Sequence, residues 1–303
     1  QRLLGEPLVR LERGRGAELT LAGMTLVDAR NKAERRLARI LPSLATDVGT
    51  QARRTASEQL NLRIAASHDL VLAALARTAP TEAALGLDVA FMGSLDALDA
   101  FAARRADLAG FHVPLGGRRW NRESFRGPLD ARSDQLIRFV DRDQGLILPR
   151  GNPARIKSLS DVASRGLRFV NRQRGSGTRL LIDQILADED IDPAKVNGFQ
   201  SEEFTHPAVA ATVASGGAGA GFGLRAAAAE YNLEFVPVVR ERYFLAVRSK
   251  DLESMGVARL IGVLRSAQFA KAASRFAGYR STGAGVVATL KMLTATESAR
   301  SSD

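Results

Sequence analysis

From about residue 60 onward, short apolar runs alternate along the chain with segments of helical spacing. The runs are rich in Val, Ile, Leu and Ala, which is typical of strands buried in a sheet. They lie at residues 62–65, 89–92, 108–113, 136–140, 146–148, 167–170, 235–239 and 243–247. The helical segments between them lie at 68–77, 94–104, 178–187, 207–215 and 224–231, and the Ala/Gly-rich stretch 214–223 is interpreted as a close-packing turn. The alternation predicts an α/β fold with parallel sheets covered by helices.

The first 59 residues have a different pattern. Two short apolar stretches flank the basic tip 14–16, which predicts a hairpin within residues 1–23. Residues 21–41 then carry apolar positions at steps of three and four, with Thr20 as the expected N-cap. This basic helix with a narrow apolar stripe either forms a dimer seam or packs on its own domain. Residues 49–59 are polar and are interpreted as a linker.

Four strand-to-helix junctions carry the candidate chemistry. They lie at residues 65–69, 91–94, 174–179 and 205–207, and they are rich in Gly, Ser, Thr, His and Arg. Ligands of open α/β sheets gather at the carboxyl ends of strands. A helix start there presents unpaired N–H groups and a partial positive charge. The pattern therefore predicts a cleft that binds a small anion.

Each of these polar residues also has a plainer interpretation. Ser67, Ser94 and Thr178 would serve as simple N-caps. The three histidines all fall at predicted strand ends without metal-binding spacing, so we expect capping or ligand hydrogen bonds instead of metal ligation. The stretch 67–69 contains the residue types of a catalytic triad, but adjacent side chains on one turn point different ways. We therefore expect no enzyme activity.

Composition narrows the class of partner and compartment. The net charge of +10 and the pI near 10.7 favour a polyanionic partner such as DNA, although an Arg-rich composition alone would also produce them. The chain has no cysteine, which fits a reducing cytoplasm. No apolar run approaches the roughly 18 residues of a membrane helix, and the N-terminal residues do not resemble a signal peptide. We expect a cytoplasmic protein with no membrane partner.

Several segments together resemble a known family. Residues 172–183, 202–210, 213–216 and 241–243, extended by 67–69, 93–94, 106–112 and 145–153, resemble the periplasmic-binding-protein-like sensor domain of one-component transcriptional regulators. That family shares the fold of periplasmic molybdate-binding proteins. Residues 4–10 and 19–23 are similar to the end of the winged helix-turn-helix of LysR-type and molybdate-responsive regulators.

The resemblance implies a fold class and a domain order. The fold would be a two-lobed α/β domain of the type II periplasmic-binding-protein-like class, preceded by a winged helix-turn-helix remnant and a linker helix. Residues 1–23 would end the winged helix-turn-helix with its wing, so that the sequence begins inside a DNA-binding domain, and 24–59 would form the dimerisation helix and linker. Residues 60–303 would form the sensing domain, with lobe I at 60–140 and 243–303 and lobe II at 145–238. The chain would cross between the lobes near 138–145 and 237–243.

The resemblance also implies a function. The protein would be a homodimeric DNA-binding transcriptional regulator whose cleft senses an anion, foremost a molybdate- or tungstate-type oxyanion, without a cofactor or metal. The expected ligand-binding residues are Ser67, His68, Ser94, His112, Arg174, Ser176, Gly177, Thr178, Thr205, His206 and Tyr243. The expected DNA contacts are Arg2, Arg10, Arg13 and Arg15.

Two departures from the family pattern bear on the ligand. Gly219 and Phe244 stand where family members often have aspartates, which puts molybdate itself in question. A small organic acid would fit Arg174 and Arg179 nearly as well as an oxyanion. Two rival functions are a solute-binding protein of a transport system and an enzyme on the same fold.

Overall fold

The structure, a computed structural model, describes residues 9–12, 16–27, 29, 60–115 and 128–293. The chain divides into two compact units, Gln1–Gln59 and Leu60–Asp303. In the first unit, β1 (Val9–Glu12) and β2 (Gly16–Leu19) pair as an antiparallel hairpin, which agrees with the expected one.

A helix follows this hairpin. Residues 21–27 and 29 are helical, and the Thr20 side chain accepts a hydrogen bond from the Gly23 N–H at 3.1 Å, so the predicted N-cap is confirmed. Arg10 lies on β1. Arg2, Arg13 and Arg15 lie outside the described residues, as does most of the predicted dimer-seam helix.

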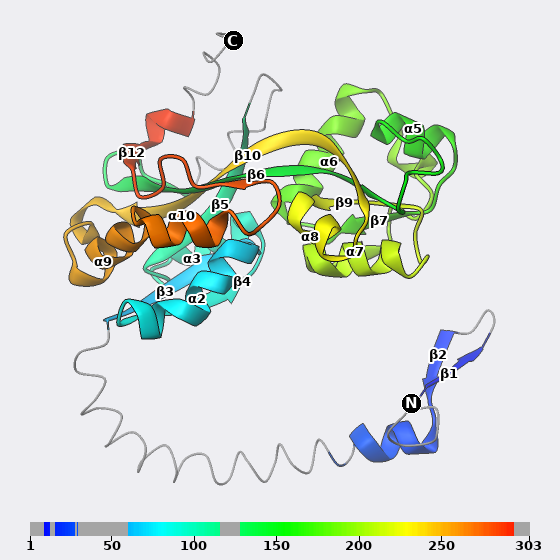
Figure 1. The fold of residues 1–303 in the computed structure, drawn as a ribbon, viewed down its shortest axis with the longest axis horizontal. Coiled ribbons are helices and arrows are strands. Elements are labelled where there is room, and N and C mark those ends of the chain that lie inside the picture. Colours follow the sequence, from blue (N-terminus) through cyan, green and yellow to red (C-terminus); the bar gives the residue numbers. More distant parts are fainter. Residues whose placement is uncertain (1–8, 13–15, 28, 30–59, 116–127, 294–303) are drawn as a thin grey trace. The chain divides into compact units, whose positions relative to one another are not determined.

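The larger unit consists of two lobes built on one curved sheet (Figure 1). One lobe contains β3 (Leu60–Ala66), β4 (Leu85–Phe91) and β5 (Leu108–Leu115). The other contains β7 (Phe169–Arg172), β8 (Glu202–Glu203) and β9 (Ala220–Leu224). The sheet runs in the order β4-β3-β5-β10-β6-β9-β7-β8. Both lobes have the same strand arrangement. Counted in chain order, the third strand of each lobe (β5 or β9) lies next to the central strands, and the second (β4 or β8) lies at the edge of the sheet.

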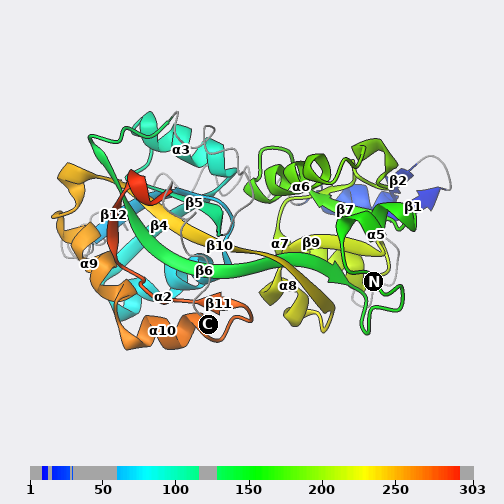
Figure 2. The ribbon, with the colours of Figure 1, turned by 90° about the horizontal axis from the view of Figure 1, so that it is seen from above.

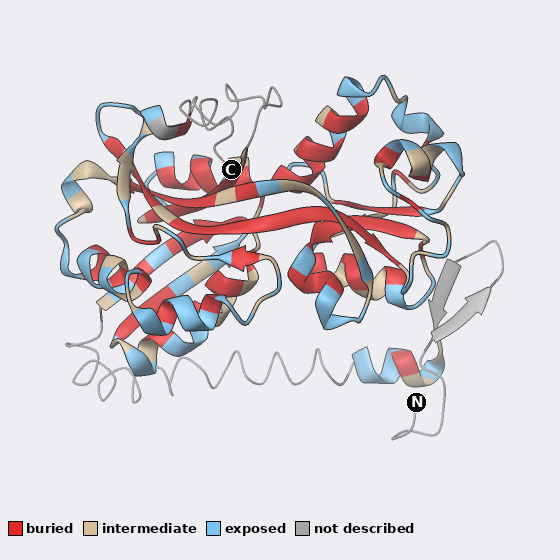
Figure 3. Ribbon diagram, turned by 45° about the horizontal axis from the view of Figure 1, so that its top comes forward, coloured by how far each residue is buried: buried red, intermediate tan, exposed pale blue. Residues whose placement is uncertain are grey.

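The two central strands, β6 (Asp134–Leu148) and β10 (Glu234–Arg248), pass through both lobes (Figure 2). They are antiparallel, with Glu241 opposite Arg142 and irregular register at Pro237/Val239 and Tyr243/Phe244. Figure 3 shows that β6 is buried along almost its whole length. The predicted crossings at 138–145 and 237–243 stay a prediction, and both segments fall within these two strands.

Helices cover both faces of the sheet, and short strands complete it. The helices are α2 (Leu70–Glu82), α3 (Ser94–Ala102), α5 (Leu159–Ser164), α6 (Gly177–Asp188), α7 (His206–Ala214), α8 (Arg225–Glu230), α9 (Met255–Leu264) and α10 (Ala267–Ala273). β11 (Tyr279–Arg280) and β12 (Val287–Thr289) pair with β6, and 3-10 turns lie at Pro193–Lys195, Ser249–Asp251 and Leu290–Leu293. Among the helices of the described segments, none combines the length and apolar character needed to cross a bilayer.

The structure differs from the sequence expectations in three places. The predicted strand pairs 136–140/146–148 and 235–239/243–247 are the single strands β6 and β10, because polar residues at their centres face partners instead of solvent. These strands run antiparallel to their neighbours, so the sheet is mixed. The predicted turn 214–223 contains part of β9, where an added Cβ at Gly221 would lie 2.5 Å from Val209 Cγ1.

Candidate functional site

The starts of four helices meet between the two lobes. α3 and α6 approach each other closely: an added Cβ at Gly177 would lie 2.6 Å from His112 Cε1 and 3.1 Å from Ser94 Oγ. Likewise, an added Cβ at Gly93 would lie 2.7 Å from the Gly175 carbonyl oxygen. The rings of His68, just before α2, and His206, the first residue of α7, have centroids 6.2 Å apart. The junctions singled out from the sequence therefore converge on one place.

Buried charged and polar side chains, most of them on the central strands, form the floor of this site between the lobes. The Arg142 guanidinium donates to Asp69 Oδ2 at 2.8 Å and to Glu241 Oε2 at 3.2 Å, and all three side chains are fully buried. Gln144 Nε2 donates to Glu241 Oε2 at 2.5 Å and to Thr178 Oγ1 at 3.2 Å. These contacts connect both central strands to α6.

The electrostatics of the floor follow from burial and pairing. Burial alone would lower the pKa of Arg142, but Glu241 and Asp69 outweigh it and raise that pKa. Burial opposes ionisation of Glu241, whereas His112 Nδ1, 2.9 Å from its Oε1, and Arg142 lower the Glu241 pKa below its ordinary value. Glu241 is therefore an ionised acceptor whose Oε2 receives hydrogen bonds from Arg142 and Gln144 and whose Oε1 lies 2.9 Å from His112 Nδ1.

Arg172, at the end of β7, is the buried cation of the site without an ion pair among the described residues. Its guanidinium donates to Gln173 Oε1 and to the carbonyl oxygens of Glu203 and Phe204 at 3.0–3.2 Å, so it meets neutral acceptors only. Burial, followed by the nearby charge of Arg142, lowers the pKa of Arg172 from 12.5 to about 9. A buried charge left without a counterion is costly, and an anionic ligand would offset that cost.

Several polar atoms in this cluster are buried yet find no hydrogen-bond partner among the described residues. They are Ser94 Oγ, Arg142 Nη2, Arg172 Nη1, Gln144 Oε1, His68 Nδ1 and His206 Nδ1. Buried polar groups in folded proteins are nearly always satisfied, so a concentration of them indicates a ligand position. Two of these six atoms belong to guanidinium groups. The first turns of α3 and α6 supply further donors, their backbone N–H groups.

The three histidines are neutral around these arginines. Burial and then Arg172 lower the pKa of His68 to about 4 and that of His206 well below its ordinary value. Burial also lowers the pKa of His112, against the opposing effect of Glu241. No group of His, Asp and Glu with metal-binding geometry occurs within the part of the chain that the structure describes.

The stretch 67–69 does not form a catalytic relay. Asp69 Oδ1 accepts from the Leu72 N–H, which caps α2, and its Oδ2 accepts from Arg142 and from the Tyr279 hydroxyl. Tyr243 donates to the Ser67 carbonyl oxygen at 2.7 Å. These contacts hold the β3–α2 junction on the central strands.

Some expected site residues lie elsewhere or have structural partners. The Arg174 side chain is 75% exposed and lies beside Glu202, outside the cluster. Arg179 is buried but pairs with Asp183 and Glu202 at 2.8 Å. Ser176 and Thr205 cap α6 and α7 by accepting from the backbone N–H groups three residues on.

Sequence reasoning missed Arg142, Gln144, Arg172 and Glu241. Three of them stand in the polar stretches 141–144 and 240–242, which interrupt apolar strands. Such an interruption is the signal in the sequence that could have identified them as site residues. Arg172 belongs to the strand that precedes the glycine-rich turn, whereas Arg174 lies in that turn and Arg179 in the first turn of α6.

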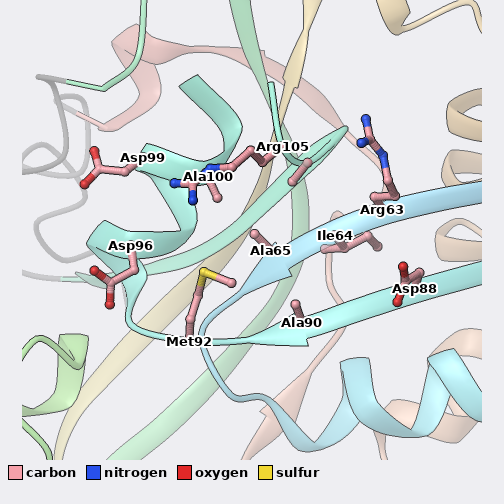
Figure 4. A pocket seen from close by; sticks show the side chains of 11 residues that line it. Arg63, Ile64, Ala65, Asp88, Ala90, Met92, Asp96, Asp99, Ala100 and Arg105 are labelled. Atoms are coloured by element: carbon pink, nitrogen blue, oxygen red, sulfur yellow. The ribbon is translucent and has the colours of Figure 1, made fainter. Parts of the chain in front are cut away.

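Two surface hollows accompany the cluster. A groove of about 570 Å³ includes Leu70 and Pro207, which directly follow Asp69 and His206 in the chain, so it borders the cluster. A separate pocket of about 440 Å³ lies between β3, β4 and α3 (Figure 4). Asp88, Asp96 and Asp99 face it together with Arg63 and Arg105. This mixture of charges favours no single sign of ligand.

Comparisons with known proteins agree with this architecture. An uncharacterized Bacillus subtilis (strain 168) protein, YvgK, is 30% identical over 198 residues, which is 65% of this chain and 64% of that protein. The chain thus spans just under two thirds of that relative. The tungstate ABC transporter structure from Geobacter sulfurreducens has a TM-score of 0.53 at 17% identity, covering 71% of this chain and 98% of that one. The Corynebacterium glutamicum OxyR C206 mutant has a TM-score of 0.50 at 16% identity, covering 88% and 76%.

The fold has therefore been found both in a transport protein and in OxyR, and these likenesses concern the fold alone. The family comparison is more direct. The family model described as the PBP superfamily domain matches residues 75–265, which include the whole of β5, β6, α6 and β10. This two-lobed chain belongs to the periplasmic-binding-protein (PBP) superfamily.

Proposed function

We propose that this protein senses a small anion between its lobes and regulates transcription in response. The observation that carries the proposal is Arg172, a buried cation with a free Nη1 and no carboxylate partner among the described residues. An anion seated there would meet Nη2 of Arg142 and the hydroxyl of Ser94 as further donors. Charge-assisted hydrogen bonds of this kind are the strong ones in proteins.

The family resemblance favours molybdate or tungstate, and the tungstate transporter is a neighbour in fold. The site itself supports the coarser statement, a small anion. Of the expected ligand residues, we propose that Ser94, His112, Gly177 and His206 surround it, together with Arg142 and Arg172.

Lobe closure would be the signal. The close approaches of Gly177 to His112 and of Gly93 to Gly175 join the lobes directly around the site. An anion that strengthens these contacts would favour the closed form. A coupling of about 1–3 kcal/mol between the anion site and the DNA-binding region would change operator affinity about 5- to 150-fold.

The N-terminal unit would carry the output to DNA as part of a homodimer in the cytoplasm. The β1–β2 hairpin would serve as the wing expected from the sequence, and the strongly basic chain supports a DNA partner. Arginines at its tip would contact phosphates and position the protein without reading sequence.

Two experiments test the proposal. Thermal-shift screening of the protein over inorganic oxyanions and small carboxylates should show an anion that raises the melting temperature, whereas stabilisation by neutral compounds alone would refute the anion site. Gel shifts with the full-length protein and operator DNA, with and without that anion, separate a regulator from a solute-binding protein. Arg15→Ala should weaken binding to all DNA sequences alike, and a sequence-selective loss would contradict a phosphate contact.

A further inference from the structure

Gln144 restricts which anions fit the proposed site. Its side chain is fully buried on β6, two residues from Arg142, and side chains two apart on a strand share a face. Both side chains donate to the same oxygen of Glu241. Gln144 therefore belongs to the floor of the site.

The orientation of the Gln144 amide is determined by its neighbours. An ionised carboxylate only accepts hydrogen bonds, so the Gln144 atom 2.5 Å from Glu241 Oε2 must be the NH₂ group. The same NH₂ group donates its second hydrogen to Thr178 Oγ1 at 3.2 Å. The carbonyl oxygen, Oε1, then faces away from both partners as a pure acceptor.

No donor reaches this oxygen among the described residues. The neighbouring unpartnered groups of Arg142, Arg172 and Ser94 supply donors, and they suit the anionic oxygens of a ligand. Gln144 Oε1 has the opposite need, because it requires a donor, and a ligand that brings its own O–H or N–H would supply one.

We propose that the ligand is an anion that also donates a hydrogen bond to Gln144, meaning a protonated oxyanion or a hydroxy acid. The proposal rests on the anion site proposed above. Hydrogen phosphate and hydrogen arsenate have this chemistry at neutral pH, as do hydroxycarboxylates. Molybdate, tungstate and sulfate do not, because they carry no proton at that pH and would leave Gln144 Oε1 buried without a donor.

Matched ligand pairs test the requirement on the whole protein by isothermal titration calorimetry at pH 7. Phosphate is compared with sulfate and molybdate, and glycolate with acetate, which differs from it by one hydroxyl. The member of each pair with the O–H group should bind about 5- to 150-fold more tightly, which is the effect of leaving one buried acceptor unsatisfied. Tighter binding of phosphate than of glycolate would identify an oxyanion, and the reverse order a hydroxy acid.

The variant Gln144→Met removes the acceptor while keeping the length of the side chain. Its ratio of phosphate to sulfate affinity should fall toward one, and its melting temperature without ligand shows whether the variant is folded. If it does not fold, the wild-type ratios decide the matter.

Three results would overturn the inference. Sulfate or molybdate binding as tightly as phosphate would show that no donor is required, and would leave the anion site itself standing. Full discrimination in a folded Gln144→Met variant would show that another group sets the preference. Absence of binding by every anion tested would refute the proposed function and this inference together.

Discussion

Replacing Arg172 with methionine should separate a binding residue from a structural one. Methionine has a similar length but no charge and no donors. We expect Arg172→Met to leave the free energy of unfolding unchanged or to raise it by about 1–2 kcal/mol in the absence of ligand, and to weaken anion binding at least about 100-fold.

The magnitude follows from the surroundings of the guanidinium. Burial and Arg142 lower its pKa from 12.5 to about 9, so the cation is on the order of 5 kcal/mol less favourable here than in water. Its hydrogen bonds to Gln173, Glu203 and Phe204 recover about 1 kcal/mol or slightly more each. The balance favours removal of the charge unless an anion is bound.

Arg179 supplies the matched control. It is equally buried in the same lobe, but it pairs with Asp183 and Glu202 and stacks on Phe199 at 4.3 Å. Arg179→Met should lower the free energy of unfolding by about 1–3 kcal/mol, because it leaves partly buried carboxylates unpaired. Its anion affinity should stay within about threefold of wild type, since side chains that do not share partners act nearly independently.

Urea denaturation followed by circular dichroism measures the stability of both variants, and calorimetric titration with an anion found by thermal shift measures binding. The reasoning fails if Arg172→Met destabilises the protein as much as Arg179→Met does and still binds the anion with wild-type affinity. In that case Arg172 would be a structural residue.

Two further predictions concern the lobe contact and pH. Gly177→Ala places a methyl group 2.6 Å from His112 Cε1, so we expect about 10-fold weaker anion binding and a larger radius of gyration by solution scattering. The control is Gly262→Ala, at a position with open space. Unchanged anion affinity in Gly177→Ala would contradict a close contact between Gly177 and His112. Burial and Arg172 lower the pKa of His68 to about 4 in the folded protein. Between pH 6.5 and 4 the unfolded chain therefore takes up a proton at His68 that the folded chain does not. Lowering the pH over this range should reduce the free energy of unfolding by up to about 3 kcal/mol. Denaturation of wild type and His68→Asn at several pH values isolates this contribution, and equal pH slopes would argue against it.

Much of the fold could be predicted because its signals are local. Apolar runs and helical spacing identify β3, β5, α3, α6 and α7 with small errors at their ends. The two central strands were divided in error because Asp141–Gln144 and Arg240–Arg242 look like polar breaks in the sequence. In the structure these residues pair with one another across β6 and β10, for example Arg242 with Asp141 at 2.8 Å, so the strands continue through them.

The site could be predicted only in outline, for a related reason. Ser94, Gly177 and His206 stand at helix starts, where short-range patterns are strong, so the sequence could point to them. Arg142, Arg172 and Glu241 lie on strands, and nothing near them in sequence shows that their side chains meet.

The sequence by itself determined the α/β class, the helix starts and the convergence of small polar residues at them, because hydrogen bonding within a few residues controls those features. Only the tertiary structure decided which arginine carries the unpaired charge. Arg172, Arg174 and Arg179 are the same residue type within one short segment. In the structure Arg172 is buried against neutral carbonyl groups, Arg174 is exposed, and Arg179 is paired with carboxylates. Their difference lies mainly in contacts with residues 23 to 32 positions away, and burial and pairing of that kind exist only once the chain has folded.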